Sequence, residues 1–386
     1  MFKKKVLIIS PGLPFPPVDG HKLKLFNLIL QLSKKVDLYL VVISNESVTE
    51  GCEAFLKENL KNYEVFRFSK LTYLLNLFKS IFNKNLPFQV AYYTFEKLQN
   101  YLKNDNQNYD YVFFNLIRTT GYVNIFDNDK VVLDLVDSIG INYLKSRKKT
   151  TSLFYKVIYS LETKRLLKHE KTCIKSSRLT LLVNKIEADY YRKYGKVSWL
   201  PNGVNKALFD KSSSKQKPII CFFGAMFYQP NVDAVLWFSK HVLPLLNPEI
   251  NFYIIGGRPT KEVLRLQNNR IIVTGFIENP YDLITSAICT VAPMQTGGGI
   301  QNKILESMAL GQITVTNNIG GNPITGSENL TNILIANTPE EFSYIINQLY
   351  NNPEKFQHIK TNAKNLILNN YSWVNYGKSL ETFLDF

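Results

Sequence analysis

The sequence is poor in the residues that build disulfides and metal sites, with four cysteines and four histidines among 386 residues. Cys52, Cys173, Cys221 and Cys289 are widely separated and lack the spacing of a metal-ligand set. The histidines are equally dispersed. This distribution predicts reduced, mostly buried thiols in a cytoplasmic protein, and we expect no metal site.

Long hydrophobic runs are also missing. No apolar stretch approaches the ~20 residues that a membrane-spanning helix requires. The apolar run at 6–9 follows three lysines, as in a signal peptide, but it is short and four prolines follow it by position 17. We therefore expect no export signal, and the run predicts a first buried strand.

Acidic residues are outnumbered, because 46 lysines and arginines face 31 aspartates and glutamates, a formal net charge of +15. An excess of this size indicates a polyanionic partner such as a phosphorylated substrate, an anionic membrane or nucleic acid. The alternative is a general enrichment in Lys and Asn, which are both abundant.

Short apolar runs alternate with helical patterns in both halves, which predicts parallel strands buried on both faces. Strands are expected at 6–9, 36–43, 111–114, 131–135, 218–223, 252–255, 271–273, 289–292 and 313–316. Helices are expected at 22–32, 234–246, 281–286, 301–310 and 339–351. The fold class is α/β, with two doubly wound Rossmann-like domains facing a cleft.

A polar, proline-bounded stretch around 201–218 predicts the domain boundary. We expect a first domain at 1–200 and a second at 201–371, with a last helix at 372–386 that packs against the first domain.

The segment 297–311 carries the chemistry. Its three glycines precede a helix whose first N–H groups have no internal partners, which suits phosphate. Lys303 adds a positive charge, whereas Glu306 would repel phosphate and is suited to hydroxyls such as those of a ribose. These residues predict a nucleotide-diphosphate site. The competing interpretation is a core helix, because Ile304, Leu305 and Met308 follow helical spacing.

Two basic amphipathic segments, 70–84 and 144–178, interrupt the α/β pattern. The first combines lysines with an apolar stripe at Leu71, Leu74, Leu75, Phe78, Ile81 and Phe82. The second carries many lysines and arginines interleaved with aromatic residues against only Glu162 and Glu170. Both are typical of helices at an anionic membrane surface. Each could equally be a solvated helix of its own domain.

The motifs at 13–22, 134–138, 201–204 and 223–311 resemble, in order and separation, the group 1 (family 4) retaining glycosyltransferases of the GT-B fold. The closest likeness is to bacterial sugar transferases of polysaccharide biosynthesis, over nearly the whole chain. The resemblance implies a second domain that holds the nucleotide sugar and a first domain that holds the acceptor.

The resemblance also implies roles for residues. The donor-binding residues would be Gly20, Gly224, Arg258, Gly275, Phe276, Ile277, Gly298, Gly299, Ile300 and Gln301. The catalytic residues would be Asp137, Lys303 and Glu306. Arg118 and Asp137 would lie on the acceptor side, although Asp137 could instead be a helix cap or turn residue.

The chain departs from the family pattern at several positions. Gly298 stands where the family has its first glutamate, so the transferred sugar is not predicted. Gln229 and Gln301 stand where similar enzymes have basic residues, and the usual first-domain histidine is absent. We expect metal-independent chemistry, because N–H groups and Lys303 can stabilise the leaving diphosphate. Asp127-Asn128-Asp129 is interpreted as a polar loop.

The predicted function is transfer of a sugar from a nucleotide-diphosphate sugar to a carbohydrate or lipid-linked acceptor hydroxyl, with retention, in cell-surface polysaccharide or glycolipid biosynthesis. The predicted location is the cytoplasm, on the inner face of the membrane. The alternatives are another GT-B enzyme such as a nucleotide-sugar epimerase, or a basic polyanion- or membrane-binding protein without catalysis. No nucleic-acid-binding module is recognisable.

Overall fold

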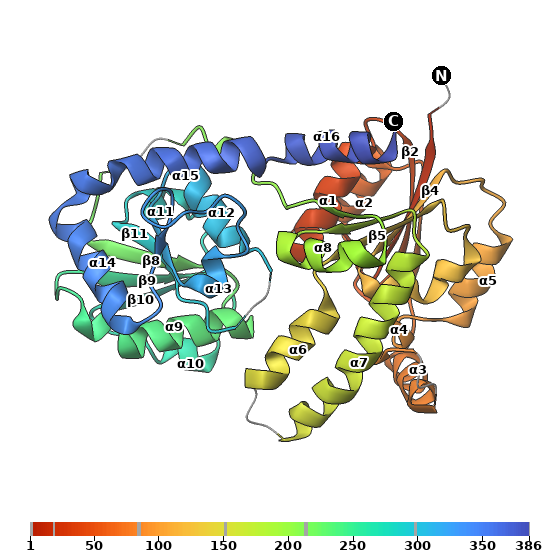
Figure 1. Cartoon of the computed structure of the whole chain (residues 1–386), viewed down its shortest axis with the longest axis horizontal. Helices are drawn as coiled ribbons and strands as arrows, with labels where there is room; N and C mark the ends of the chain where they lie inside the picture. The colour runs from red at the N-terminus through yellow and green to blue at the C-terminus, as the bar shows by residue number, and fades with distance from the viewer. Residues whose placement is uncertain are drawn as a thin grey trace. The chain divides into compact units, whose positions relative to one another are not determined.

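The computed structural model describes residues 3–17, 20–82, 86–149, 153–211, 215–296 and 299–385. The chain divides into two compact units (Figure 1). Unit 1 comprises Met1–Pro201 and Tyr376–Phe386, and unit 2 is the continuous stretch Asn202–Asn375.

Unit 1 is built on a seven-stranded parallel sheet in the order β3-β2-β1-β4-β5-β6-β7. Its strands are β1 Lys5–Ser10, β2 Asp37–Ile43, β3 Asn62–Phe66, β4 Tyr111–Asn115, β5 Val131–Val136, β6 Leu179–Leu182 and β7 Val197–Trp199. Every residue of β4 and β6 is buried, which explains why the central strands are continuous apolar runs.

The helices of unit 1 connect successive strands, as parallel pairing requires. They are α1 Gly20–Leu32, α2 Glu50–Asn59, α3 Lys70–Phe82, α4 Phe88–Ala91, α5 Glu96–Asn104, η1 Ile117–Ile125, α6 Ile139–Lys149, α7 Leu153–Lys175, α8 Lys185–Tyr191 and η2 Arg192–Tyr194. The last helix of the chain, α16 Trp373–Leu384, begins in unit 2 and ends in unit 1. Within unit 1, the Tyr111 hydroxyl donates to the carbonyl of Leu384 (2.7 Å).

A fully buried ion pair lies at the centre of unit 1. Lys24 of α1 and Asp134 of β5 are both 0% exposed, with 2.5 Å between Nζ and Oδ1. Asn115 of β4 donates to the other carboxylate oxygen of Asp134 (3.3 Å), and His21 contacts the Asn115 amide oxygen (2.6 Å). The pair therefore ties α1 to the carboxyl ends of two neighbouring strands.

Unit 2 has a six-stranded parallel sheet in the order β10-β9-β8-β11-β12-β13. Its strands are β8 Ile219–Phe223, β9 Asn251–Ile255, β10 Ile271–Gly275, β11 Cys289–Ala292, β12 Thr314–Thr316 and β13 Leu334–Ile335. Its helices are η3 Lys206–Leu208, α9 Gln229–His241, η4 Leu243–Leu245, α10 Lys261–Leu264, α11 Tyr281–Thr285, α12 Asn302–Ala309, α13 Asn318–Gly321, α14 Pro339–Asn351, η5 Pro353–Phe356 and α15 Gln357–Asn370.

Helix boundaries differ from the predicted ones where a proline lies at the start or just after the end of a helix. The helix expected at 234–246 is α9, which begins five residues earlier at Gln229 because Pro230 occupies its first turn. It ends at His241, and Pro244 lies in the short 3-10 turn that follows. The helix expected at 301–310 begins at Asn302, with Gln301 as its N-cap.

All four cysteines are buried and unbridged, as the sequence predicts. Among the described residues, no helix is long and apolar enough to cross a membrane. No cluster of His, Cys, Asp and Glu suited to a metal ion occurs in that part of the chain either.

Replacing Lys24 with Ala should leave the Asp134 carboxylate buried and unpaired, at a cost of about 3–5 kcal/mol of unfolding free energy. The double variant Lys24→Met, Asp134→Leu should recover most of that loss, because no isolated charge remains. Urea unfolding monitored by circular dichroism measures the free energy of unfolding of both variants. Lys57→Ala, which removes a surface pair with Glu53, is the control and should unfold like the parent. A double variant as unstable as Lys24→Ala would contradict this account.

Candidate donor site

Three glycines end adjacent strands of unit 2 at the same edge of the sheet. Gly224, Gly256 and Gly275 lie at the ends of β8, β9 and β10, and all three have positive φ (148°, 156° and 69°). The Gly224 N–H donates to the carbonyl of Ile255 (3.0 Å), and the Gly256 N–H donates to that of Gly275 (2.9 Å). The carboxyl edge of this sheet is thus lined by backbone rather than by side chains.

Gly256 leaves no room for a side chain, and a side chain on Gly224 would require the Asn231 amide to shift. A Cβ atom on Gly256 would lie 1.8 Å from the carbonyl oxygen of Gly224, a backbone atom that cannot move aside. A Cβ atom on Gly224 would lie 2.9 Å from the Asn231 amide and 3.5 Å from the Lys303 ammonium. A side chain at Gly224 would therefore press on the Asn231 amide, the group that binds Lys303.

Lys303 is the second residue of α12 and reaches back toward β8. Its ammonium donates to the Asn231 amide oxygen and lies 4.2 Å from the centre of the Phe222 ring. The Asn231 amide nitrogen in turn donates to the carbonyl of Ala225 (2.9 Å). Lys303 is half-buried, and burial lowers its pKa to about 7.

Glu306 follows Lys303 by three residues and lies on the same face of α12. Burial raises the pKa of its carboxyl group to about 7, while Tyr281, the first residue of α11, opposes the rise as a hydrogen-bond donor. The charge of Lys303 opposes the rise as well. A cation and a carboxylate that both titrate near neutrality therefore lie side by side on one helix.

The N-terminus of α12 has no side-chain cap. Gln301 occupies the N-cap position, and its amide points back to the carbonyl of Gly299 (3.4 Å). Gly299 and Ile300 precede it and are half-buried, whereas the predicted Gly298 lies outside the described residues, as does Gly297. The first N–H groups of α12 are thus available to an anion, in the orientation that the helix dipole favours.

The remaining predicted donor residues surround this edge of the sheet. Phe276, directly after β10, is 78% exposed, and Ile277 beside it is half-buried. Arg258 follows β9 with a left-handed φ of 53°, and its guanidinium lies 3.9 Å from the centre of the exposed Phe227 ring. An exposed aromatic ring and a guanidinium suit a nucleobase and a phosphate respectively.

Gly20 and Arg118 belong to unit 1. Gly20 is the exposed first residue of α1. Arg118 lies in η1, directly after β4, where its Nε donates to the Gln89 side chain (2.8 Å) and its guanidinium lies 5.8 Å from the Tyr93 ring. The Gln89 amide donates onward to the Tyr143 hydroxyl (2.8 Å), so Arg118 belongs to a fixed polar group.

Asp137 follows β5, one strand away from Arg118. It is half-buried as a residue, but its Oδ1 atom is enclosed and has no hydrogen-bond partner among the described residues. Burial raises the pKa of this carboxyl group, and the charges of Lys24 and Lys145 oppose the rise. It caps no helix through a side-chain hydrogen bond in the described part of unit 1.

The sequence did not single out two partners of the donor site. Asn231, the residue bound to Lys303, lies in a Pro-Asn segment that we used only for the family resemblance. Tyr281 marked the start of a predicted helix. Asn231 contacts Lys303, 72 positions away, and Tyr281 contacts Glu306, 25 positions away. These contacts therefore follow only from the fold.

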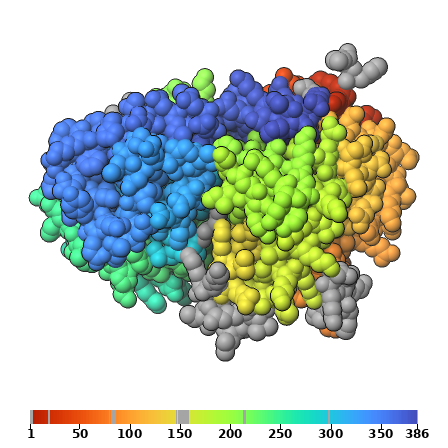
Figure 2. Space-filling view, in the orientation of Figure 1, coloured from red at the N-terminus to blue at the C-terminus, as the bar shows by residue number. Residues whose placement is uncertain are grey.

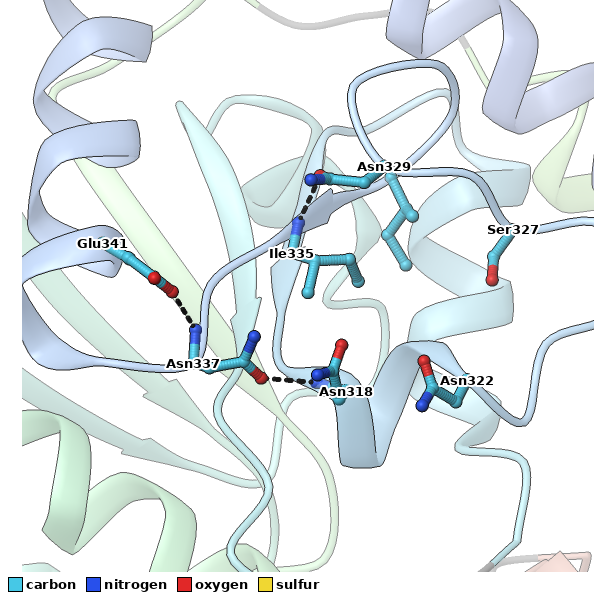
Figure 3. Close-up of a pocket in the computed structure, with 8 residues that line it drawn as sticks. Asn318, Asn322, Ser327, Asn329, Ile335, Asn337 and Glu341 are labelled. Atoms are coloured by element: carbon cyan, nitrogen blue, oxygen red, sulfur yellow. Dashed lines mark hydrogen bonds between the residues drawn. The ribbon is translucent and has the colours of Figure 1, made fainter.

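A separate polar hollow of about 450 Å³ lies at the carboxyl ends of β12 and β13 (Figure 3). Figure 3 shows its polar side chains around Ile335: Asn318, Asn322, Ser327, Asn329, Asn337 and Glu341. The amide oxygens of Asn329 and Asn337 accept from the N–H groups of Ile335 (2.8 Å) and Asn318 (3.1 Å). Among the described residues, no lysine or arginine lines this hollow and no predicted donor residue takes part in it, so its lining does not suit a diphosphate.

Comparison with known proteins points to the same unit. Residues 217–352 match the family model described as "Glycosyl transferases group 1". A curated relative, an uncharacterized glycosyltransferase of Methanocaldococcus jannaschii, is 25% identical over 179 residues, which are 44% of this chain and 45% of the relative. The alignment therefore spans less than half of that protein.

Solved structures are similar over almost the whole chain. HepE of Anabaena in complex with UDP superimposes with a TM-score of 0.67 at 14% identity, covering 99% of both chains. Sucrose-phosphate synthase of Thermosynechococcus elongatus gives 0.69 at 14% identity, covering 98% of both. The protein has the GT-B fold. The GT-B assignment confirms the predicted fold class of two doubly wound α/β units.

All the predicted donor residues of this GT-B protein except Gly20 lie within the matched range 217–352. The family match relates residues 217–352 to the group 1 glycosyl transferases, and the structural neighbours show the fold. The roles of the individual residues remain predictions.

Gly256→Ala should abolish binding at this edge, because the new methyl group would collide with the Gly224 carbonyl. Gly257→Ala is the matched control, since a Cβ atom there meets the Phe276 side chain at 3.6 and 3.8 Å, which are ordinary contact distances. Thermal unfolding with and without UDP measures both. We expect stabilisation by UDP in the parent and in Gly257→Ala and none in Gly256→Ala. Equal behaviour of the two variants would contradict the close-approach argument.

Proposed function

We propose that the protein is a retaining glycosyltransferase that moves a sugar from a nucleotide-diphosphate sugar to an acceptor hydroxyl, in cell-surface polysaccharide or glycolipid biosynthesis. One observation carries the proposal: the lysine and the carboxylate on α12 stand beside an uncapped helix N-terminus at a glycine-lined sheet edge. HepE, a structural neighbour, has been solved with UDP-glucose, so UDP sugars are the first donors to test.

Each group has a role in the proposed donor complex. The N–H groups of Gly299, Ile300 and the first turn of α12 would hold the diphosphate, with Lys303 as the counter-charge. The Glu306 carboxylate would accept hydrogen bonds from the ribose hydroxyls. Phe276 and Ile277 would contact the base, and Arg258 would lie near the phosphates.

The chemical step moves charge onto the diphosphate. The bond between the anomeric carbon and the phosphate oxygen breaks, and its electron pair leaves with the nucleoside diphosphate. The acceptor oxygen forms the new bond to the anomeric carbon on the same face and loses its proton, for which Asp137 is the proposed base. Fixed N–H groups and Lys303 stabilise the developing charge, so we expect transfer to survive EDTA.

Glu306→Ala should weaken UDP binding about 10- to 100-fold, since each hydrogen bond to a charged group contributes about 1.5–3 kcal/mol. Binding should also depend on pH in a bell shape centred near 7. Below that pH Glu306 is protonated, and above it Lys303 loses its charge. Titration calorimetry across the range measures this, and Glu306→Gln should lose the acidic limb alone. Unchanged affinity in Glu306→Ala would refute the ribose assignment.

Transfer itself needs a separate assay. With a labelled UDP sugar, a transferase yields labelled product only when an acceptor is present. An epimerase would act on the donor alone, so labelled sugar released or inverted without acceptor would favour that alternative.

We further propose that the protein works on an anionic membrane surface, where a lipid-linked acceptor would lie. On α3, four apolar side chains are 50–65% exposed: Leu71, Leu74, Leu75 and Phe78. Contiguous exposed apolar side chains of this kind mark interaction sites. Lys84 of the predicted segment lies outside the described residues.

The charge around this stripe has one sign. No acidic residue occurs between Glu64 and Glu96, and the only two at 139–178, Glu162 and Glu170, are buried. In Figure 1, α3 and α7 project on the same side of unit 1, and Figure 2 shows α6 and α7 at the surface. Exposed apolar side chains together with an excess of lysines and arginines suit an anionic bilayer.

The double variant Leu74→Glu, Phe78→Glu should reduce co-sedimentation with phosphatidylglycerol vesicles at least tenfold, because it places charge in the apolar stripe. Phosphatidylcholine vesicles should bind the parent weakly, and binding should fall with salt. Leu368→Glu, at a leucine of α15 that is 48% exposed, is the matched control. Equal sedimentation of parent and double variant would refute membrane binding through α3.

A further inference from the structure

A buried amide holds the side chain of Lys303. Asn231 lies in the first turn of α9, and only 4% of the residue is exposed. Its amide oxygen accepts a hydrogen bond from the Lys303 ammonium, and its amide nitrogen donates to the carbonyl of Ala225 (2.9 Å). Because a carbonyl can only accept, Ala225 fixes which end of the amide faces the lysine. Asn231 therefore presents an oxygen to Lys303 and cannot turn over without losing both bonds.

The backbone around Asn231 leaves its side chain little freedom. The N–H of Asn231 donates to the carbonyl of Tyr228 (2.9 Å). On the side of β8, a Cβ atom on Gly224 would lie 2.9 Å from the Asn231 amide nitrogen, so the amide occupies space that a larger residue would fill. The amide is thus fixed by the fold itself, before any ligand binds, as a group that orients a binding side chain must be.

The Lys303 ammonium has hydrogen-bonding capacity that the fold does not use. An ammonium carries three N–H donors. Within the described ranges, the bond to Asn231 is the one hydrogen bond that it makes, and it forms no ion pair with a carboxylate there. A half-buried cation with two further donors and its charge uncancelled is suited to an anion.

Lys24 of unit 1 shows the contrast. It is paired with the carboxylate of Asp134, and both side chains are fully buried. A carboxylate cancels the charge of its lysine, which suits a structural role. An amide oxygen binds the ammonium through its dipole alone, so Lys303 keeps its positive charge. The kind of partner therefore separates a structural lysine from one that can bind an anion.

We propose that Asn231 is a positioning residue that holds the Lys303 ammonium in place without cancelling its charge, so that Lys303 can bind the diphosphate of the donor. This role rests on the proposed function, because the anion is the diphosphate of a nucleotide sugar. As the bond to the anomeric carbon breaks, its electron pair moves to the phosphate oxygen. An ammonium that is already in position stabilises this charge without rearrangement.

The variant Asn231→Asp tests the need for a neutral partner. The substitution keeps the size of the side chain and its Oδ1 atom, and it converts the contact into an ion pair like that of Lys24 with Asp134. UDP affinity at pH 7 should fall about tenfold or more, because the lysine is neutralised and the new carboxylate repels the diphosphate. Titration calorimetry measures this. If Asn231 only stabilised the fold, an ion-paired Lys303 would leave UDP binding intact, so unchanged affinity would overturn the proposal.

Asn332→Asp is the matched control. Asn332 also belongs to unit 2 and is 7% exposed. Its amide oxygen accepts from the N–H of Glu328 (2.9 Å), and its amide nitrogen donates to the carbonyl of Gly326 (3.0 Å). The substitution adds the same charge and removes the same kind of hydrogen bond, but it does not touch Lys303. It should bind UDP like the parent, and an equal loss in both variants would contradict the positioning role.

A double-mutant cycle tests whether Asn231 acts through Lys303, and it does not require the aspartate variant to fold. Asn231→Ala and Lys303→Met should each weaken UDP binding about tenfold. In the Lys303→Met background, Asn231→Ala should cause no further loss, because the ammonium that it positions is gone. Additive losses would show that Asn231 acts independently of the lysine and would overturn the proposal.

The contact itself can be measured without a nucleotide. In lysine-labelled protein, the ¹³Cε signal of Lys303 should report a pKa of about 7, which burial lowers and the charge of Glu306 raises. In Asn231→Asp the added negative charge should raise the pKa of Lys303 well above 7. UDP binding should then fall although Lys303 is charged over a wider pH range, so deprotonation would not explain the loss. An unchanged Lys303 titration in this variant would contradict the contact.

The outcomes separate the role of Asn231 from the proposed function. A parent protein that binds UDP, with Asn231 variants that bind it equally well, would overturn the positioning role and leave the transferase intact. A parent that binds neither UDP, GDP nor ADP and transfers no sugar would refute the proposed function, and the positioning role with it.

Discussion

The candidate donor site depends on the contact between two backbones at the carboxyl edge of the second sheet, where Gly256 leaves no room for a Cβ atom beside the Gly224 carbonyl. Because β8 and β9 can end this close together, Lys303 reaches past Gly224 to Asn231. The lysine, the carboxylate that follows it and the uncapped start of α12 are then presented together. A methyl group on Gly256 would therefore disturb an arrangement of residues that lie far apart in the sequence.

Buried charge is treated in three ways in this molecule. Lys24 and Asp134 form a buried ion pair, and Glu170 accepts hydrogen bonds from several donors. In both cases the buried charge is compensated within the fold, as expected of structural residues. In Lys303 and Glu306 of unit 2 and in Asp137 and Glu187 of unit 1, burial shifts the pKa away from its ordinary range. Perturbed groups of this kind are typical of functional sites.

The sequence predicted the sheets well because central parallel strands such as β1 and β4 are unbroken apolar runs. It overlooked four strands of two to five residues, β3, β6, β7 and β13. It also started α9 too late, because it gave Pro230 too little weight as a helix start. The glycine segment and Glu306 were recognisable from local pattern and family resemblance. Contacts such as Lys303 with Asn231, or Ser138 with Glu187, join residues 72 and 49 positions apart and follow only from the topology.

The way the chain enters and leaves unit 2 has a consequence of its own. The Val204 N–H donates to the carbonyl of Tyr371 (2.9 Å), and Gly203 lies against the backbone of Trp373. The two ends of unit 2 are thus fastened to each other, and unit 1 resumes directly afterwards at Tyr376. In topological terms, unit 2 is inserted into the sequence of unit 1, and it is not a second domain that simply follows the first. A cassette with adjoining ends can be exchanged whole, which offers a route by which donor preference could change while the acceptor-side scaffold is kept.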